Sequence, residues 1–372
     1  MRVKLEDVCE RGSSNIKQSD IIKMSGNYPI YGASGLAGKV NFYHQEQPYV
    51  AVVKDGAGIG RTTLNPAKSS VIGTMQYLIP KKNVLAEYLF YVVSYMHLEK
   101  YYTGATIPHI YFKDYKNEEF NLDNIEKQLE IIDVLGRCKK VIEARKQELV
   151  ELDSLTKARF VELFGDPVAN PMHWPVKRLK ELAIQINSGN TPKGGSENYV
   201  EKGITFFRSQ NVWKDRLEMD DIAYIDEKTH ESMKRSSLKH GDILMTKTGR
   251  INTENSSLGR AALYEGEDDM ANVNGHVYFI RLKEGVNNKF VLRVLVSPEY
   301  RDLIRSVCVG GIDKRQLNKE HIEEFPIIYP PSEMIDNYIE FVEQVNKSKV
   351  AVQKALDETQ ILFDSLMQKY FG

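Results

Sequence analysis

The chain has few cysteines and no long apolar run. Its three cysteines, Cys9, Cys138 and Cys308, form no closely spaced pair in 372 residues. This scarcity argues against a disulfide framework and a structural zinc site, and it is typical of a reducing compartment. No apolar stretch approaches the roughly 20 residues of a membrane-spanning helix, and the N-terminal residues do not resemble a signal peptide. We therefore predict a cytoplasmic protein with no membrane partner.

The chain also lacks an excess of charge of either sign. Its formal net charge is −1, with 27% charged and 42% hydrophobic residues. No global basic field therefore indicates a nucleic-acid partner, although a local basic patch is compatible with this balance. The length is sufficient for about two to four domains with cores of their own.

Catalytic and metal-binding motifs are missing as well. Gly56-Ala57-Gly58-Ile59-Gly60 follows a predicted strand, Tyr49–Lys54, and resembles a nucleotide-binding turn. Such a site needs a helix next, so that its N-terminus faces the ligand, but Arg61–Pro66 reads as strand and turn. The eight histidines show no HExxH or other paired-ligand spacing. We therefore expect neither a catalytic site, nor a metal site, nor a cofactor in this chain.

What the sequence does contain is a long heptad pattern, repeated. The first run lies in 126–164, which has no proline and one glycine, and the second lies beyond Met334. Apolar residues at this spacing form one helix face that must pack against another helix. A helix as long as the first run would measure about 55–60 Å. The residues expected to pair the helices or dock other subunits are Leu135, Ile142, Leu149, Leu152, Val342, Val345, Val352, Leu356 and Phe363.

The two heptad runs share their phase, which indicates an internal repeat. A shift of 207 carries Leu135 onto Val342, and it carries Phe164-Gly165 onto Phe371-Gly372. Shorter matches between the two halves are weaker. The difference in residue number between matching residues only grows along the chain, from 174 for Leu5 and Leu179 to 206 for Gly104 and Gly310. Such an order is typical of one duplicated unit whose second copy carries extra loop residues.

These patterns predict an α+β fold in which two globules alternate with two long helices. The helices are expected to pair as an antiparallel coiled coil, although heptads alone do not fix direction, and the halves are expected to be related by a pseudo-two-fold repeat. The predicted segments are 1–125 (first globule), 126–165 (central helix), 166–175 (linker), 176–331 (second globule) and 332–372 (C-terminal helix).

Basic and amide side chains cluster at glycine-rich turns of both halves. Such turns present cations and backbone N–H groups to phosphates. Arginine pairs with guanine edges in the major groove, and glutamine or asparagine pairs with adenine edges. The segment 234–240 is also basic. The candidate binding residues are Tyr31, Ser34, Lys54, Arg61, His109, Lys113, Arg208, Gln210, Asn211, Lys247, Arg250, Arg260, Lys314 and Arg315.

Several ordered stretches resemble the specificity subunit of a type I restriction-modification enzyme. They include Phe206–Val212, Gly241–Gly249 and Asn274–Val277, then Gly310-Gly311 and Phe325–Pro331 before the last helix. The resemblance covers essentially the whole chain. The first half departs from it before its helix, where Phe120-Asn121-Leu122 replaces the Pro-Pro pattern.

This resemblance implies two target recognition domains, each of which reads one half of a split sequence in double-stranded DNA. It further implies that the helices act as a spacer and as the docking surface for two methyltransferase subunits, which bind S-adenosylmethionine. Restriction (translocase) subunits would join them. The chain itself would be a non-catalytic subunit.

Two other functions remain compatible with the residues alone. A self-contained DNA methyltransferase would use the turn Gly56–Gly60 for its cofactor, and S-adenosylmethionine would then bind to the isolated chain. A non-DNA coiled-coil adaptor would show no salt-sensitive affinity for DNA.

The candidate cations can be tested in the second half. We expect Lys247→Ala and Arg260→Ala each to weaken DNA binding by the assembled complex, because each removes a charge from a glycine-rich turn. Affinity measured over a salt series gives both the strength and the salt slope. Unchanged affinity and slope in both variants would contradict these assignments.

Overall fold

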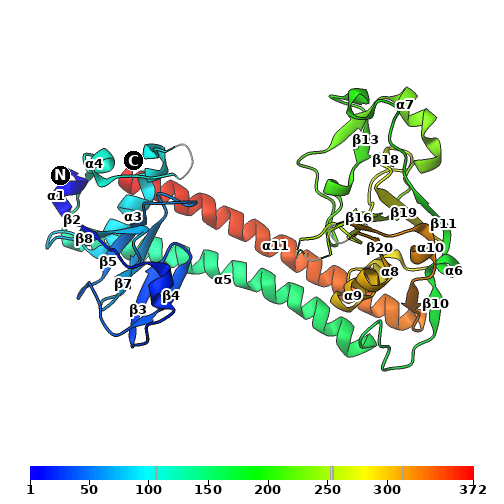
Figure 1. Ribbon diagram of the computed structural model, residues 1–372, viewed down its shortest axis with the longest axis horizontal. Coiled ribbons are helices and arrows are strands. Elements are labelled where there is room, and N and C mark those ends of the chain that lie inside the picture. Colours follow the sequence, from blue (N-terminus) through cyan, green and yellow to red (C-terminus); the bar gives the residue numbers. More distant parts are fainter. Residues whose placement is uncertain (105–107, 252, 254, 312–313) are drawn as a thin grey trace. The chain divides into compact units, whose positions relative to one another are not determined.

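The computed structural model describes residues 1–104, 108–251, 253, 255–311 and 314–372 (Figure 1). The chain divides into two compact units. Unit 1 comprises Met1–Val150 and Lys349–Gly372, and unit 2 comprises Glu151–Ser348. Each of the two long helices, α5 (Ile125–Phe164) and α11 (Ser332–Phe371), therefore contributes one part to each unit.

Unit 1 is an α+β unit with three small sheets. The strand orders are β2-β8-β5-β6, β4-β3-β7 and β1-β9. The strands are β1 (Arg2–Lys4), β2 (Cys9–Ser13), β3 (Tyr28–Gly32), β4 (Gly35–Val40), β5 (Tyr49–Val53), β6 (Thr62–Asn65), β7 (Ser70–Val71), β8 (Met75–Pro80) and β9 (Glu119–Asn121). Its helices, besides the long ones, are α1 (Leu5–Val8), α2 (Gln18–Ile21), α3 (Ala86–Tyr95) and α4 (Phe112–Tyr115).

The apolar runs of the first half form the predicted elements. All five residues of β5 are buried, which is why this strand reads as an uninterrupted apolar run. The glycine-rich turn after β5 leads into the strand β6 and not into a helix, so it lacks the helix N-terminus of a nucleotide site. The helix α3 ends at Tyr95, and His97 shortly after it has a left-handed backbone with φ of 50°.

Unit 2 repeats the plan and enlarges it. Its strand orders are β11-β19-β15-β17, β12-β14-β13-β18, β16-β21-β20 and β10-β22. The strands are β10 (Val176–Arg178), β11 (Ala183–Ser188), β12 (Tyr199–Val200), β13 (Ile204–Phe207), β14 (Ala223–Ile225), β15 (Ile243–Thr246), β16 (Thr248–Gly249), β17 (Ala261–Leu263), β18 (Ala271–Val273), β19 (Val277–Leu282), β20 (Val309–Gly310), β21 (Arg315–Gln316) and β22 (Pro326–Ile328). The shorter helices are α6 (Leu179–Leu182), α7 (Glu227–Ser232), α8 (Asn288–Leu295), α9 (Pro298–Val307) and α10 (Lys319–Glu323).

The internal repeat predicted from the sequence is confirmed element by element. The main sheets have the same order, since β2, β8, β5 and β6 correspond to β11, β19, β15 and β17. Both ends of β1 and of α1 lie 174 residues before those of β10 and α6, and both ends of α5 lie 207 residues before those of α11. The pair β1-β9 also exists in unit 1, so the absence of the Pro-Pro pattern does not remove this sheet.

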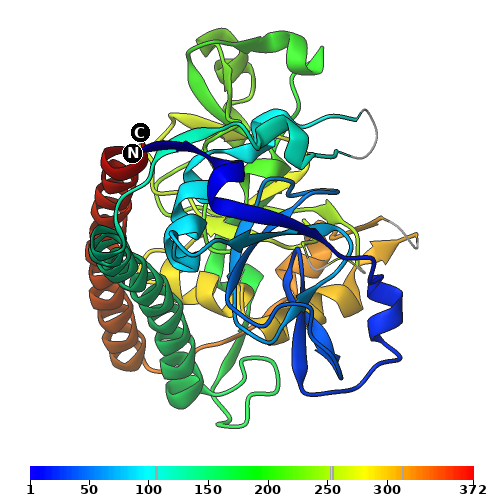
Figure 2. The ribbon, with the colours of Figure 1, turned by 90° about the vertical axis from the view of Figure 1, so that its left-hand side faces the viewer.

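The long helices pack against each other within each unit. In unit 1, Ile131 and Leu135 of α5 share a core with Met367 and Phe371 of α11. In unit 2, Phe160 and Phe164 near the end of α5 contact Tyr338 near the start of α11, with ring centroids 5.6 and 5.5 Å apart. The start of one helix thus lies beside the end of the other in both units, which makes the pair antiparallel (Figures 1 and 2).

The predicted heptad positions form the covered face of both helices. Leu135, Ile142, Val345, Val352 and Leu356 are buried. The remaining predicted positions, Leu149, Leu152, Val342 and Phe363, are half-buried. Thr156 of α5 is also buried, and its backbone carbonyl lies 3.5 Å from the Tyr338 hydroxyl.

Local signals explain where α5 begins and ends. The side chain of Asn124 accepts a hydrogen bond from the backbone N–H of Lys127 at 2.9 Å, which caps the first turn. Gly165 follows the last turn with a left-handed φ of 73°, a backbone conformation that favours glycine.

Charge in the covered face should destabilise the helix pair. Leu356→Asp places a carboxylate in an apolar contact, and we expect it to lower the free energy of unfolding by at least about 3 kcal/mol. The matched control is Val350→Asp on the same helix, because Val350 is 71% exposed. Urea unfolding of the full chain measures both variants, and equal effects would rule out the packing described for α11.

Candidate nucleic-acid interface

In unit 1, the candidate residues form two groups, at either end of the turn after β5. The first group contains Lys54, His109 and Lys113. Nδ1 of His109 lies 2.6 Å from a carboxylate oxygen of Asp55, and Lys54 forms an ion pair with the same carboxylate. Lys113 Nζ lies 5.4 Å above the ring centroid of Tyr111. At this end of the turn, Lys54 and the imidazole of His109 therefore share one carboxylate.

The carboxylate of Asp55 supplies the negative charge of this first group. Burial by itself raises the pKa of Asp55, but hydrogen bonds from Lys54 and His109 outweigh burial and lower it. The carboxylate therefore remains ionised at neutral pH and offsets part of the positive charge of Lys54. Lys113, which is exposed, lies outside this ion pair.

The second group of unit 1 lies at the β3–β4 turn. A guanidinium N–H of Arg61 donates a hydrogen bond to the carbonyl of Ala33 at 3.1 Å, which ties the start of β6 to this turn. Tyr31 is half-buried and Ser34 is exposed on either side of Ala33. The structure thus brings Arg61, Tyr31 and Ser34 together although about 30 residues separate them in the sequence.

In unit 2, four candidate cations surround the small sheet β16-β21-β20. Lys247 directly precedes β16, and its Nζ lies 5.7 Å from the ring centroid of Tyr278. Arg315 pairs with Gly249 across β16 and β21. Arg250 and Lys314 are exposed, and both line a cavity of about 520 Å³. Residues 312 and 313, which precede Lys314, lie outside the described residues.

The remaining candidates of unit 2 follow β13. Arg208 and Gln210 both donate to Asp221, whose pKa these hydrogen bonds lower. The backbone N–H of Asn274 donates to the carbonyl of Phe207 at 3.0 Å, and the backbone N–H of Lys247 donates to that of His276 at 2.8 Å. The turn 274–276 therefore joins the segment after β13 to the segment after β15.

Two predicted binding residues of unit 2 have buried side chains. Asn211 is 1% exposed, and its amide donates to the carbonyls of Glu218 and Asp221. Arg260 is 6% exposed and stacks on Trp213, with 3.8 Å between the guanidinium carbon and the ring centroid. Both side chains shape the neighbouring loops. An effect of Arg260→Ala on binding is therefore expected to arise through the loop.

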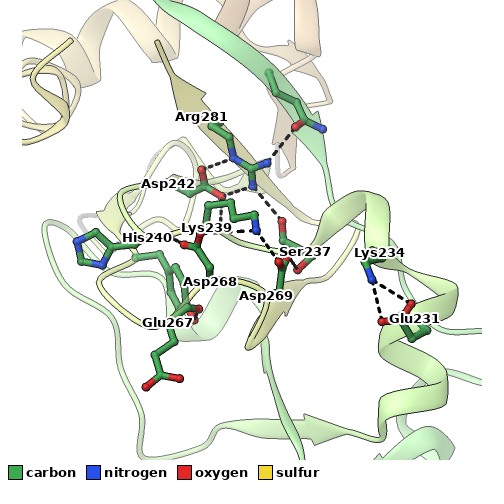
Figure 3. Close-up of polar contacts among 12 residues, drawn as sticks. Glu231, Lys234, Ser237, Lys239, His240, Asp242, Glu267, Asp268, Asp269 and Arg281 are labelled. Carbon is green, nitrogen blue, oxygen red and sulfur yellow. Dashed lines mark hydrogen bonds and ion pairs between the residues drawn. The ribbon is translucent and has the colours of Figure 1, made fainter. Parts of the chain in front are cut away.

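The basic segment 234–240 is neutralised by a separate polar network, shown in Figure 3. Lys234 forms an ion pair with Glu231, and Lys239 forms ion pairs with Asp268 and Asp269. The hydrogen bond from Lys239 lowers the pKa of Asp269, so this carboxylate is charged at neutral pH. The segment is basic in sequence, but acidic partners brought in from the β17–β18 turn and from α7 cancel much of its charge.

The centre of this network is a buried ion pair between Asp242 and Arg281. The carboxylate is 1% exposed and lies 2.7 Å from a guanidinium nitrogen, while Arg281 also donates to the carbonyl of Ser237 at 3.0 Å (Figure 3). Burial raises the pKa of Asp242 even though Arg281 opposes that rise. Asp242 precedes β15 and Lys247 follows it, so the pair anchors the strand end remote from the candidate cations.

Some residues at the surface were missed by the sequence reasoning. His276 is exposed in the turn that joins the two groups of unit 2, and Trp213 is stacked on Arg260. The turn 274–276 carries a sequence signal, since Asn, Gly and His in succession mark a polar loop. Trp213 carries no such signal, because its role depends on an arginine 47 residues further along the chain.

In the part of the chain that the structure describes, no group of three histidine, cysteine, aspartate or glutamate side chains is placed to hold a metal ion. Nor does any described helix combine the length and the apolar character needed to cross a membrane.

The chain matches known proteins over most of its length. Residues 1–153 and 171–361 match the family model of the type I restriction modification DNA specificity domain. A curated relative is the type I restriction enzyme MjaIX specificity subunit of Methanocaldococcus jannaschii. It is 25% identical over 313 residues, which make up 78% of this chain and 69% of the relative.

Solved structures share the fold over the whole chain. The S subunit of a type I restriction-modification system from M. genitalium has a TM-score of 0.61 at 16% identity and covers 100% of this chain and 96% of its own. A structure that describes complex assembly and conformational transition of the type I R-M system has a TM-score of 0.58 at 15% identity, with 100% and 97% covered. At these identities, the likeness concerns the fold alone.

The buried ion pair can be tested without any ligand. Arg281→Ala leaves the buried carboxylate of Asp242 without its charged partner, and we expect the unfolding free energy to fall by about 3 kcal/mol. The control is Lys234→Ala, whose exposed pair with Glu231 should contribute little. Urea unfolding of the full chain at neutral pH measures both variants.

The pH dependence gives a second measurement of the same variant. When the pKa of a carboxyl group is raised in the folded state, the folded protein loses stability as the pH rises through that pKa. Because removal of Arg281 leaves burial unopposed, the pKa of Asp242 should rise further. The difference in unfolding free energy between the wild type and Arg281→Ala should thus become smaller as the pH falls below 7. A difference that becomes larger would contradict this assignment.

Proposed function

The chain belongs to the family of the type I restriction modification DNA specificity domain, and from this premise we propose how its two units divide the recognition of DNA. The chain acts as the DNA sequence recognition subunit of a type I restriction-modification system. We propose that unit 1 and unit 2 each read one half of a bipartite target in double-stranded DNA.

The observation that carries this proposal is a repeated scaffold with unlike loops. The main sheets of the two units have the same strand order, whereas the polar residues at their turns differ. Unit 1 presents Lys54, His109 and Lys113, while unit 2 presents Arg208, Gln210 and Lys247. Because base edges are distinguished by the donors and acceptors placed against them, unlike loops favour two different half-sites.

The long helices are the proposed spacer between the half-sites. Both helices contribute to the largest apolar cluster of each unit. We propose that their length sets the number of base pairs left unread, and that their outer faces dock two methyltransferase subunits. Supporting the docking, Val150 of α5 and Ile361 of α11 are 58% and 69% exposed.

The chemistry of modification is assigned to the partners. We propose that the methyltransferase subunits hold S-adenosylmethionine, that restriction (translocase) subunits complete the complex, and that this chain is non-catalytic and acts in the cytoplasm. A self-contained methyltransferase is disfavoured, because the turn Gly56–Gly60 leads into β6 and offers no helix N-terminus to a cofactor. A coiled-coil adaptor without DNA does not account for the family match.

Co-expression with a methyltransferase subunit of the same system tests the proposal. Sequencing of methylated adenines should reveal an asymmetric bipartite target. We expect Gln210→Ala to relax the preference at one half by about tenfold, because it removes an amide that can bind a base edge. His109→Ala should relax only the other half.

The matched control is Lys234→Ala. Lys234 lies in unit 2 but outside the candidate interface, so this variant should methylate the same target sequence. Methylation at no defined sequence would refute the recognition role. If each variant altered both halves, the division of labour between the units would be wrong, although recognition itself would stand.

A further inference from the structure

A cavity in unit 2 has the composition of an anion site. It lies between β16 and the loop that leads to β17, and its volume is about 520 Å³. We name it the hydroxyl cavity. Its lining residues are Thr248, Gly249, Arg250, Thr253, Asn255, Ser256, Ser257 and Lys314.

The lining combines small donors with two cations. Four of the eight residues carry hydroxyl groups, one carries an amide, and Arg250 and Lys314 are exposed basic side chains. No aspartate or glutamate is among the described lining residues. Hydroxyl, amide and cationic groups are the donors that proteins present to phosphate oxygens.

Two arginines, the buried Arg260 and the half-buried Arg301, hold the wall of the hydroxyl cavity in place. Arg260 donates from Nε to the carbonyl of Ser256 at 3.0 Å and from a terminal nitrogen to the carbonyl of Asn255. Arg301 of α9 also donates to the carbonyl of Ser256, at 3.4 Å. The two guanidiniums bind the loop through its carbonyls and place positive charge behind the hydroxyl groups.

The positive charges of Arg260 and Arg301 act on each other. Burial lowers the pKa of Arg260, and the charge of Arg301 lowers it further. Next to the cavity, Arg315 pairs with Gly249, and its Nε is buried without a hydrogen-bond partner among the described residues. Four basic side chains, those of Arg250, Arg260, Arg301 and Lys314, thus line or underlie one polar cavity.

The loop approaches the strand closely, which gives the cavity a fixed floor. A Cβ added at Gly249 would lie 2.2 Å from the backbone nitrogen of Leu258 and 2.8 Å from Oγ of Ser256. The Ser257 hydroxyl donates to the carbonyl of Thr248 at 2.7 Å. Glycine at 249 therefore permits an approach that any other side chain would prevent.

We propose that the hydroxyl cavity binds one phosphate group of the DNA backbone in the half-site of unit 2. This inference rests on the proposed function and assigns the cavity a contact that adds affinity and register without sequence preference. Base reading by unit 2 then falls to other side chains, and Gln210 is the strongest candidate because its amide can pair with a base edge.

The test compares the wild-type complex with the double variant Arg250→Gln/Lys314→Gln. Fluorescence anisotropy with a duplex carrying the mapped target gives affinity over a salt series. The slope of log K against log salt should become shallower by about 0.9 for each phosphate that the double variant no longer binds. Affinity for target and scrambled duplexes should fall by the same factor, and Lys234→Gln should leave both quantities unchanged.

A scan with single methylphosphonates locates the bound phosphate. Each substitution removes the charge of one backbone phosphate. At one position of the unit 2 half-site, the wild type and Lys234→Gln should bind more weakly, while the double variant should bind as it does to the unmodified duplex. Equal sensitivity of the double variant at every position would overturn the proposal, as would a loss of preference for target over scrambled duplex.

Free phosphate is the competing source of the same chemistry. Titration of inorganic phosphate into the full chain without DNA distinguishes the two sources. If the double variant lost phosphate binding but kept the wild-type salt slope on DNA, the cavity would belong to a free anion. If the wild type failed to discriminate the target at all, the proposed function itself would fail, which is a separate outcome. Circular dichroism melting confirms that the exposed substitutions leave the fold intact.

Discussion

The burial of one apolar face on each long helix is the constraint on which the rest of the structure depends. A helix of 40 residues with a heptad face cannot leave that face in water, so α5 requires α11 as a cover. Because each helix runs through both units, the same packing also completes both cores. Ile131 and Met367 belong to one core, and Phe160 and Tyr338 belong to the other. Neither globule can therefore be treated as a domain that folds around its own segment alone.

The repeat explains why the two units share a scaffold and differ in their surfaces. Strand order depends on buried apolar residues such as those of β5 and β15, and both strands are buried throughout. Turns lie outside this constraint, so the second copy could lengthen its loops. The pairing of β16-β21-β20 has a smaller counterpart in unit 1, in the bridges between Asp55 and His109 and between Thr103 and His109. The proposed recognition of two unlike half-sites by one chain is consistent with this separation of scaffold and loop.

Charge in this protein is local. The chain as a whole is nearly neutral, and the segment 234–240 loses its basic character through carboxylates such as Asp268 and Asp269. Around β16, by contrast, Arg250 and Lys314 are exposed, and Arg260 and Arg301 bind the neighbouring loop through the carbonyl of Ser256. The distribution of ion pairs, more than the count of lysines and arginines, therefore separates structural cations from candidate binding cations.

The sequence by itself determined the repeat, the long helices and their covered face, because heptad spacing and apolar runs are properties of neighbouring residues. It placed both ends of α5 and α11 within a few residues, and it identified the turns that carry Lys54, Lys247 and Lys314. Tertiary structure alone decided which polar residues reach the surface. Arg260 and Asn211 were predicted to bind, but backbone carbonyls and Trp213 hold them inside. Such interactions join segments far apart in the chain, and their geometry leaves no periodic trace in the sequence.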